Sequence, residues 1–209
     1  MAEIGVTEQE KVWSGEFGDE YIGRNAAEES RLASYLRFWA RVLSHASGVD
    51  SVFEFGANIG LNLKAIRQLL PNAKMDALEI NEKACSILKG IIGNGHVYNQ
   101  SFQSFVPDRQ YDLTFSRGVL IHINPSSIKD CYERLYAASR KYVLVAEYYN
   151  PKPVSLPYRG QDGLLFKRDF AGEMMDMFPD LKLLEYGFVY HRDPVFPQDD
   201  ITWFLLQKA

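Results

Sequence analysis

The segment that most constrains the fold is VFEFGANIG, residues 52–60. Its apolar start predicts a buried strand, and the turn that follows opens a helix over 61–70, which Pro71 ends. Gly56 allows the backbone to pass close to a ligand, and Gly60 allows the helix and the strand to pack tightly. Asn58 lies within the turn, where asparagine tolerates a positive φ better than most residues. The segment therefore predicts a strand, turn and helix with a ligand site at the turn.

Strands and helices alternate along most of the chain. Before the first strand, an amphipathic helix is indicated by apolar residues at a three-to-four spacing: Leu32, Tyr35, Leu36, Trp39, Val42 and Leu43. Later strands are predicted over 74–80, 96–99, 111–116, 142–147, 183–191 and 201–207, with helices before most of them. This alternation predicts an α/β fold with a doubly wound, mostly parallel sheet and a ligand at the carboxyl ends of its strands. We expect one structural domain, with an N-terminal helical cap or lid over 1–47 and the main domain over 48–209.

Two segments depart from this alternation. Residues 149–167 contain Pro151, Pro153, Pro157, Gly160 and Gly163 without periodicity, which predicts a long functional loop. Near the N-terminus, Trp13, Phe17 and Tyr21 recur every four residues, which places their rings on one predicted helical face. We expect both segments to close over the ligand site and exclude water. The alternative for the N-terminal rings is an amphipathic helix that only packs on the domain.

Composition narrows the class of protein. The chain has 209 residues, a formal charge of −4 and a polar start that is typical of neither a signal nor a transit peptide. It contains no apolar run of about 18 residues, the length that a membrane span needs. The acidic balance disfavours nucleic acid as a partner, because phosphate binding requires clustered Lys and Arg. Cys85 and Cys131 lack a CxxC or histidine neighbour and are expected to be buried thiols. We therefore expect a cytoplasmic protein without a membrane or nucleic-acid partner.

The second strand supplies the group that identifies the ligand class. Glu79 ends that strand 19 positions after Gly60, where a carboxylate can accept hydrogen bonds from both hydroxyls of a ribose. The glycine spacing is G-x-x-x-G, which matches neither the G-x-G-x-x-G of dinucleotide folds nor the Walker pattern. Together these features predict a nucleoside-type site.

These motifs resemble the class I S-adenosylmethionine-dependent methyltransferases along nearly the full chain. EFGANIG resembles their first motif, Glu79 their acidic ribose residue, and YDLTFSRGVLIHI (111–123) the strand and loop beside the methyl-transfer site. The resemblance implies a seven-stranded, Rossmann-like sheet of order 3-2-1-4-5-7-6 with the last strand antiparallel. It also implies S-adenosylmethionine as cofactor and S-adenosylhomocysteine as product.

The resemblance assigns the cofactor site residue by residue. Ser101 and Phe102 fall where an acidic side chain and the next backbone N–H read the adenine, although this chain has serine in place of the acid. Glu54 either ties the amides of the turn or contacts the methionine amine, and Arg24 or Arg31 is expected to pair with the methionine carboxylate. The remaining predicted contacts are Tyr21, Gly56, Ala57, Asn58, Gly60, Ile80, Ser116, Arg117 and Gly118.

Three segments resemble more narrowly the methylases associated with pseudaminic acid biosynthesis: WSGEFGDEYIGRN (13–25), EFGANIGLN (54–62) and the region 149–176. This resemblance implies a small-molecule acceptor such as a nonulosonic, acidic nine-carbon sugar or its precursor. Tyr148, Tyr158, Arg159, Lys167 and His191 are the expected substrate-binding residues, since arginine can bind a carboxylate through two parallel hydrogen bonds. Arg168 follows Lys167 and Arg192 follows His191, so each adds a basic side chain next to a predicted substrate residue.

Two residues are candidates for the chemistry. His122 lies just beyond the fourth strand, and an imidazole that titrates near neutrality can remove a proton from an acceptor hydroxyl. The same histidine can equally pack against the cofactor and orient the turn. Glu147, at the end of the fifth strand, is the competing carboxylate, expected to bind either acceptor hydroxyls or a helix end. No arrangement of carboxylates for magnesium is evident, so we expect no metal.

Other functions remain compatible with these residues. A protein or nucleic-acid methyltransferase is the main alternative within the same fold. Nucleic acid as the substrate is disfavoured by the acidic charge and by SRGV on the fourth strand, where base-methylating enzymes have an NPPY-type motif. A catalytically silent S-adenosylmethionine-binding protein would retain Gly56, Gly60 and Glu79 equally well. A nicotinamide-dependent oxidoreductase is disfavoured by the glycine spacing. The preferred hypothesis is O- or N-methylation of a small molecule.

Overall fold

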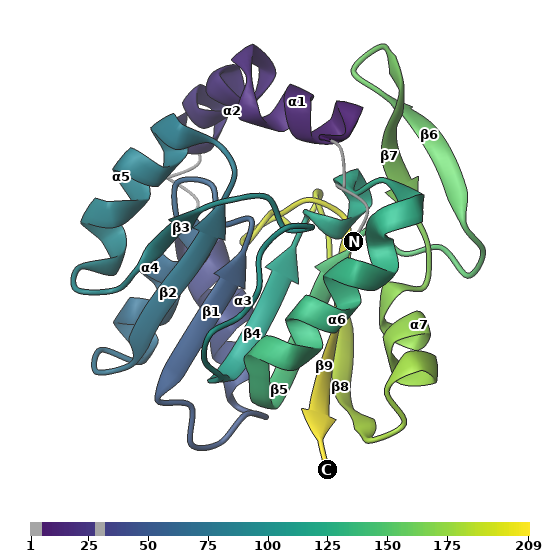
Figure 1. The fold of residues 1–209 in the computed structure, drawn as a ribbon. Helices are drawn as coiled ribbons and strands as arrows, with labels where there is room; N and C mark the ends of the chain where they lie inside the picture. Colours follow the sequence, from purple (N-terminus) through teal and green to yellow (C-terminus); the bar gives the residue numbers. More distant parts are fainter. Residues whose placement is uncertain (1–5, 28–31) are drawn as a thin grey trace.

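A computed structural model describes residues 6–27 and 32–209 (Figure 1). Its centre is a seven-stranded sheet of order β3-β2-β1-β4-β5-β9-β8. The strands of this sheet are β1 (Ser51–Phe55), β2 (Lys74–Glu79), β3 (Val97–Asn99), β4 (Tyr111–Arg117), β5 (Ser139–Glu147), β8 (Leu181–Val189) and β9 (Ile201–Lys208). The helices are α1 (Glu8–Ser14), α2 (Glu16–Ala27), α3 (Leu32–Leu43), α4 (Leu61–Leu69), α5 (Glu82–Ile92), α6 (Ile128–Ala138) and α7 (Phe170–Met177).

The strand directions match the expected topology. The strands from β3 to β5 pair in parallel, and β9 pairs antiparallel with both β5 and β8. Counting only strands of this sheet, the order is 3-2-1-4-5-7-6, with the last strand antiparallel. The predicted Rossmann-like architecture is therefore confirmed, and the parallel strands place their carboxyl ends along one edge.

Side chains alternate across the sheet and build a core on each face. On β1, Val52 packs in the core with α3, α4 and α5, whereas Phe53 and Phe55 pack in the core with α6 and α7. The helix α3 packs one face in the first of these cores, where Trp39 and Val42 are completely buried. The expected boundary at residue 47 puts α3 in the cap, but its side chains pack with the strands, so the cap over the described residues consists of α1 and α2.

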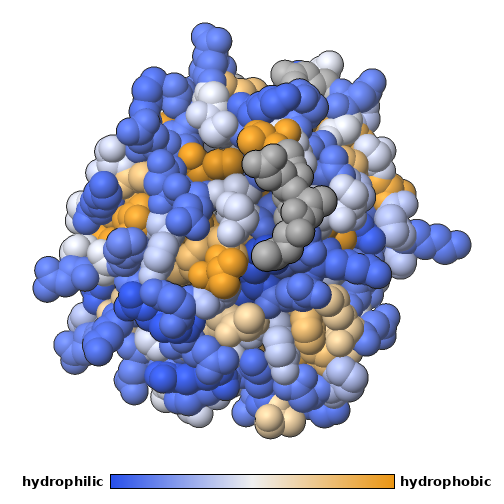
Figure 2. All heavy atoms as spheres, viewed as in Figure 1, coloured by the Kyte–Doolittle hydropathy of each residue, from blue (hydrophilic) through white to orange (hydrophobic). Residues whose placement is uncertain are grey.

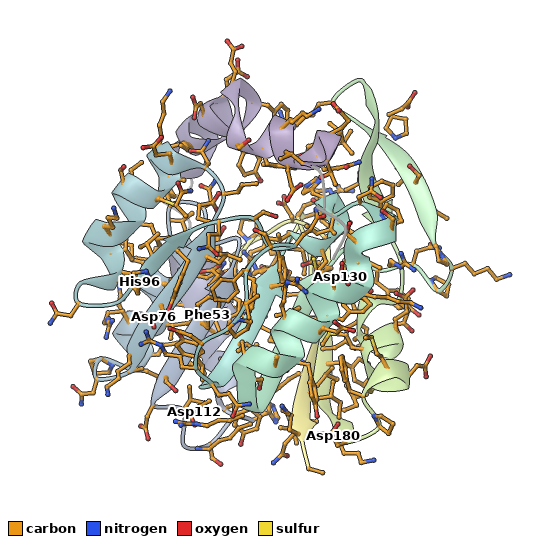
Figure 3. The ribbon with its side chains drawn as sticks, in the orientation of Figure 1. Phe53, Asp76, His96, Asp112, Asp130 and Asp180 are labelled. Atoms are coloured by element: carbon orange, nitrogen blue, oxygen red, sulfur yellow. The ribbon has the colours of Figure 1, made fainter. Side chains whose placement is uncertain are left out.

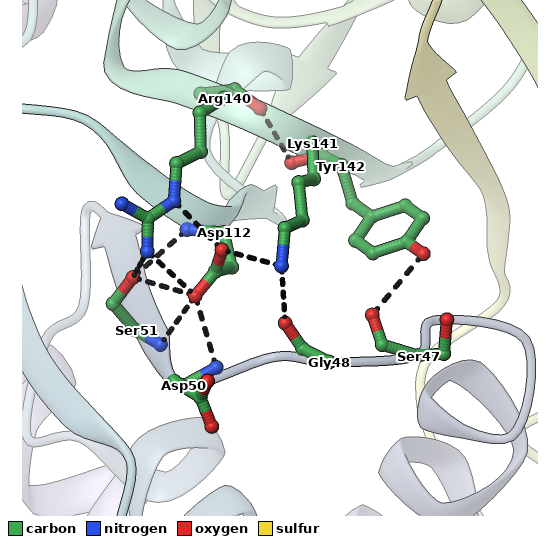
Figure 4. A network of polar contacts seen from close by, with 9 residues as sticks. Ser47, Gly48, Asp50, Ser51, Asp112, Arg140, Lys141 and Tyr142 are labelled. Carbon is green, nitrogen blue, oxygen red and sulfur yellow. Dashed lines mark hydrogen bonds and ion pairs between the residues drawn. The ribbon is translucent and has the colours of Figure 1, made fainter.

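The amino ends of the strands are tied by a buried carboxylate. Asp112 of β4 accepts hydrogen bonds from the backbone N–H of Asp50 and Ser51 at 3.0 and 3.1 Å (Figure 4). Arg140 donates to both carboxylate oxygens at 2.7 and 3.0 Å, and Lys141 Nζ lies 3.0 Å away. These donors hold the pKa of Asp112 well below its usual range, despite the desolvation that opposes them. Asp112 lies at the edge of the molecule opposite α1 and α2 (Figure 3), so this network serves the fold and leaves the carboxyl edge for a ligand.

The region 149–167 is not the irregular loop that the sequence predicts. It contains a β-hairpin of β6 (Val154–Tyr158) and β7 (Gln161–Lys167), which stands beside the sheet (Figure 1). The connecting residues Arg159 and Gly160 have φ of 52° and 79°. Positive φ at both central residues is the signature of a type I′ turn, whose twist suits a hairpin. Most side chains of β6 are exposed, so no buried face imposed an alternating apolar pattern on the sequence.

The N-terminal aromatic residues also differ from the predicted single helix. Gly15 separates two helices, so Trp13 lies on α1 while Phe17 and Tyr21 lie on α2. The three rings nevertheless meet, since Phe17 and Tyr21 each pack edge-on against Trp13 with centroids 5.2 Å apart. Both helices lie above the carboxyl edge of the sheet (Figure 1).

Both cysteines are buried, as expected. Among the described residues, no helix is long and apolar enough to cross a membrane. On the face seen in Figure 2, hydrophobic residues form separate patches among hydrophilic ones.

Candidate functional site

Two cavities lie where the carboxyl edge of the sheet meets the cap. The first encloses about 740 Å³ and the second about 610 Å³, in each case including space open to solvent. Both are lined by Gly56, Asn58, Gly118 and Val119, so they adjoin along the contact between the turn after β1 and the loop after β4. Together they form one candidate site for a long ligand.

The turn after β1 has the backbone geometry that the sequence predicts. Gly56, Asn58 and Gly60 all have positive φ, of 72°, 47° and 81°. A Cβ on Gly56 would lie 2.6 Å from a methyl of Val119, and one on Gly60 would lie 2.6 Å from a methyl of Leu88. Gly56 therefore allows the turn to approach the loop after β4, whereas Gly60 serves helix packing and lines neither cavity.

Glu79 lies at the floor of the first cavity with Ile80. Its Oε2 accepts from the Asn58 backbone N–H at 2.6 Å, and its Oε1 accepts from the Asn81 backbone N–H at 2.8 Å. Burial raises the pKa of Glu79, while these N–H groups oppose that rise. The carboxylate is thus oriented by both neighbouring turns, and each oxygen retains a lone pair for a ligand hydroxyl.

The far wall of the first cavity is partly aromatic. Phe102 is buried and stacks on Phe55 with ring centroids 4.4 Å apart. Ser101 lines the same wall, but its hydroxyl donates to a carboxylate oxygen of Glu10, which comes from α1. The structure therefore brings Ser101 and Phe102 to the site, together with Glu10 of the cap, which no sequence motif had indicated as a site residue.

The second cavity is more polar and contains Glu54, which is 1% exposed. One oxygen of Glu54 accepts from Asn62 Nδ2 at 2.7 Å, and Asn62 in turn accepts from the Trp39 indole N–H at 3.1 Å. The other oxygen, Oε2, is buried and has no hydrogen-bond partner within the described chain. Burial raises the pKa of Glu54 well above its ordinary value. Glu54 was predicted either to bind the amides of the turn after β1 or to contact the methionine amine. Its hydrogen bonds in the structure include none to the amides of that turn.

Arg117 lines the second cavity beside Glu54. Its Nη2 donates to Gln198 Oε1 at 2.7 Å, and its guanidinium lies over the Tyr35 ring, 4.6 Å from the centroid. Its Nε is buried and, among the described residues, has no hydrogen-bond partner. Tyr21, Ala57 and Asp199 also line this cavity. The half-buried Arg117 and the buried Glu54 therefore line the same cavity, and each has one buried atom without a hydrogen-bond partner in the described chain.

His122 lies in a short 3-10 helix, Leu120–His122, and lines the first cavity. Its Nδ1 is 2.6 Å from the Leu164 carbonyl oxygen, which can only accept, so Nδ1 carries the proton and Nε2 keeps a lone pair. The ring packs between Trp13 and Tyr158 at centroid distances of 4.6 and 4.9 Å. Burial lowers the pKa of His122 to about 4, so the imidazole is neutral at neutral pH.

Glu147 is buried and its oxygens are engaged with the protein. Oε1 accepts from Ser116 Oγ at 2.7 Å and from the backbone N–H of Val119 and Leu120 at 3.2 and 3.1 Å. Oε2 accepts from the Ile121 N–H at 3.4 Å. Burial raises the pKa of Glu147 to about 7, against the effect of these donors. Neither Glu147 nor Ser116 lines a cavity, so the geometry matches the predicted helix-end role better than contact with an acceptor.

The predicted substrate residues divide into two groups. Tyr158 contacts His122, and the Arg159 guanidinium lies over the Tyr158 ring, 5.4 Å from its centroid. Lys167 Nζ lies over the Tyr148 ring at 5.2 Å. These four residues lie on or beside the hairpin, whereas His191 is exposed and pairs with Asp200 at 2.8 Å. None of the five predicted substrate residues lines either of the two cavities.

The two arginines predicted to pair with the methionine carboxylate lie wholly or partly outside the described structure. Arg24 belongs to α2, but its side chain lies outside the described part of the structure, and Arg31 lies outside the described residues altogether. Glu10, Gln103, Asn62 and Asp199 line the cavities without having been predicted. For Glu10 a local signal existed, because Thr7 and Glu10 form the T-x-x-E pattern of a capping box. For the others, the sequence offered no spacing that ties them to the site.

Comparison with known proteins supports the fold. No protein-family model matches the sequence, and no curated protein matches it. Among solved structures, the chain is similar to 1,6-didemethyltoxoflavin-N1-methyltransferase from Burkholderia thailandensis, with a TM-score of 0.73, 14% identity and coverage of 100% of this chain and 92% of that one. It is similar to magnesium protoporphyrin IX methyltransferase from Synechocystis PCC 6803, with a TM-score of 0.69, 12% identity and full coverage of both chains.

A sugar-modifying enzyme is also similar. The amino pentose methyltransferase of calicheamicin biosynthesis from Micromonospora echinaspora matches with a TM-score of 0.63 and 10% identity, over 92% of this chain and 96% of that chain. Those three structures carry bound S-adenosylmethionine or S-adenosylhomocysteine. At such low identity the likeness establishes the Rossmann-like methyltransferase fold.

Proposed function

We propose that the protein is an S-adenosylmethionine-dependent methyltransferase that acts on an oxygen or nitrogen of a small molecule. The observation that carries the proposal is the pair of unpaired buried atoms in the second cavity, Glu54 Oε2 and Arg117 Nε. Buried polar atoms in folded proteins nearly always have partners, so an unpaired pair in a cavity marks a place for a ligand. The methionine end of the cofactor brings an ammonium for Glu54 and a carboxylate for Arg117.

The first cavity suits the other end of the same cofactor. The oriented carboxylate of Glu79 would accept from the ribose hydroxyls, and Ile80 and Phe102 offer apolar surfaces to the base. Gly56 and Gly118 line both cavities and would lie against the middle of the ligand. The residues present therefore fit S-adenosylmethionine from end to end.

The protein's part in the reaction is mainly to position the acceptor. The bound cofactor supplies an electrophilic methyl group on its sulfonium. Transfer needs the acceptor atom held in line with the methyl, which is an effect of orientation. His122, neutral and with a free lone pair on Nε2, would accept the proton that an acceptor hydroxyl must lose. Trp13 and Tyr158 pack on both sides of this imidazole and restrict water around it.

The acceptor we propose is an acidic sugar of the nonulosonic type or its precursor. Arg159 and Lys167 support this, because they place positive charge on the hairpin beside Tyr158 and Tyr148. The similarity to an amino pentose methyltransferase supports a carbohydrate acceptor in a fold of this kind. A methyl-transfer screen of nonulosonic acids and their nucleotide-activated forms, read by mass, tests the proposal. Methylation of neutral acceptors alone would contradict it.

Cofactor binding is tested by calorimetry with S-adenosylhomocysteine and, as the comparison ligand, NAD. We predict binding of the former in preference to the latter. Glu79→Ala should weaken S-adenosylhomocysteine binding by about 5- to 150-fold, since unpaired ribose hydroxyls cost roughly 1–3 kcal/mol. Glu82→Ala, on the neighbouring exposed helix surface, is the matched control. Unchanged affinity in Glu79→Ala would remove the ribose anchor from the proposal.

A further inference from the structure

The cap contributes a carboxylate to the interior of the first cavity. Glu10 of α1 lines that cavity together with Ser101, Phe102 and Gln103, all of which follow β3. Glu10 and Ser101 are 91 residues apart in the chain, and the Ser101 hydroxyl donates to Glu10 Oε1. The contact places a carboxyl group from the cap on the wall of the cavity, beside Ser101. The helix that carries it, α1, lies over the carboxyl edge of the sheet (Figure 1).

The position of the Glu10 carboxylate is fixed by its own helix. Its Oε2 accepts from the Thr7 backbone N–H at 2.7 Å and from Thr7 Oγ1 at 3.0 Å. The first of these bonds and the Glu10 backbone N–H, which donates to Thr7 Oγ1 at 3.3 Å, form the capping box of α1. These bonds leave Oε1 to face Ser101. A carboxylate oxygen has two acceptor sites, so Oε1 can receive a second donor besides the Ser101 hydroxyl.

Gln103 is a second, independent indication that a hydrogen-bond donor of a ligand binds in this part of the first cavity. Its side chain is 1% exposed, and its Nε2 donates to Thr7 Oγ1 at 3.4 Å. Its Oε1 is buried and has no hydrogen-bond partner in the part of the chain that the structure describes. An unsatisfied buried amide oxygen costs free energy unless a ligand supplies the missing donor. Glu10 and Gln103 thus present two acceptors at one end of the cavity.

We propose that Glu10 and Gln103 recognise the exocyclic amine of adenine and so select an adenosyl cofactor. The inference rests on the proposed function and assigns the base-reading residues of that site. An exocyclic amine carries two N–H donors, which is the number of acceptors that Glu10 and Gln103 provide. A base with a carbonyl oxygen at the same position would direct its lone pairs at both acceptors and would be rejected.

This assignment couples cofactor binding to the cap. Glu10 reaches the base only when α1 lies on the cavity, since Glu79, Phe102 and Gln103 come from the sheet and its loops. The Thr7 and Glu10 pair therefore links the helix cap of α1 to the ligand. Loss of the Glu10 charge should affect affinity for the base without affecting the ribose contact at Glu79.

The test compares binding of S-adenosylhomocysteine and S-inosylhomocysteine by calorimetry. In the second compound a carbonyl oxygen replaces the amine. The wild-type protein should prefer the adenosyl compound by about a hundredfold or more, as sites built around a ligand's donor do. Glu10→Gln should lower the affinity for S-adenosylhomocysteine by about tenfold and reduce the preference over S-inosylhomocysteine to about tenfold or less. Glutamine preserves the capping box, so α1 should keep its helix.

Two further variants make the result specific. Glu8→Gln removes an exposed charge from the same helix and should bind both compounds as the wild type does. Ser101→Asp combined with Glu10→Gln supplies a carboxylate from the opposite wall and should restore the preference. If Glu10→Gln retains the full preference, Glu10 does not read the base, while the proposed function stands. If the wild type binds neither compound, the proposed function itself is wrong.

Discussion

At the scale of single residues, His122 illustrates how one backbone contact fixes the chemistry available to a side chain. The Leu164 carbonyl holds the proton on Nδ1 and leaves Nε2 as the basic atom. Burial lowers the pKa of His122 to about 4, below the value near 6.5 of an unperturbed histidine. A histidine in this state acts as a base at neutral pH without first having to lose a proton.

We predict that His122→Ala lowers turnover by about 10²–10⁴ while S-adenosylhomocysteine affinity changes little, because a general base acts on the chemical step. Wild-type turnover should be flat above about pH 6 and fall only as the pH approaches the lowered pKa of about 4. Rate measurements across pH, with exposed His45→Ala as the control, test both expectations. Activity within a few-fold of wild type in His122→Ala would show that the ring only packs in the site.

At the scale of elements, Glu147 connects β5 to the loop that carries His122. Its carboxylate accepts from three consecutive backbone N–H groups, of Val119, Leu120 and Ile121. The loop also supplies Gly118 to both cavities. The end of β5 therefore determines the position of a loop that contacts the proposed cofactor and acceptor.

Glu147→Gln should disturb this loop, since an amide N–H₂ would face at least one backbone donor. We expect the free energy of unfolding to fall by about 1–3 kcal/mol, the cost of leaving a buried group unpaired. Turnover should fall together with S-adenosylhomocysteine affinity, in contrast to His122→Ala. Thermal melts and calorimetry on the same preparations measure these effects. Normal affinity with reduced turnover would instead favour direct contact of Glu147 with the acceptor.

The network around Asp112 leads us to a prediction about how the stability of the fold depends on pH. Its folded-state pKa is depressed by Arg140, Lys141 and two backbone N–H groups, so it stabilises the fold above the unfolded pKa of about 3.9. That contribution is lost as the pH falls below this value toward the folded pKa. Asp112→Asn should lower stability by about 1–3 kcal/mol at pH 7 and less at pH 3. Denaturant titrations at both pH values, with exposed Asp50→Asn as control, test this; an equal loss at both would contradict it.

Burial determined which elements could be predicted from the sequence. The strands β1, β2, β4 and β5 are mostly buried, so short apolar runs revealed them, and the buried face of α3 revealed that helix by its periodicity. Gly56, Asn58 and Glu79 lie close enough in sequence for spacing to indicate a site. The hairpin β6–β7 was missed because β6 is largely exposed, and because on β7 the consecutive residues Leu164 and Leu165 are both buried, so neither strand has an alternating apolar pattern. Glu10 and Gln103 were missed as site residues because they meet only through the docking of α1, which local patterns do not encode.

At the scale of the whole molecule, the site is closed by two segments that lie far apart in the chain, the N-terminal helices α1 and α2 and the hairpin β6–β7. Gln9 Nε2 of α1 donates to the Gly163 carbonyl of the hairpin at 2.9 Å, and Asn124 Nδ2 donates to Gln9 Oε1 at 3.3 Å. On the other side, Asn81 donates to Asp19 of α2 at 2.9 Å. These are individual polar contacts around cavities, so the cap can separate from the domain at a lower cost than the core can unfold.

We therefore predict that the cap and the hairpin form a lid that closes on the ligand. Adding S-adenosylhomocysteine should slow hydrogen exchange in α1, α2 and β7, because ligand contacts add to the few bonds that hold them. The buried strands β1 and β4 should change little and serve as the internal control. Gln9→Ala removes the bonds to Gly163 and Asn124, so it should speed exchange in both α1 and β7 without ligand. Equal exchange with and without ligand in the wild type, or an effect of Gln9→Ala confined to α1, would contradict a common lid.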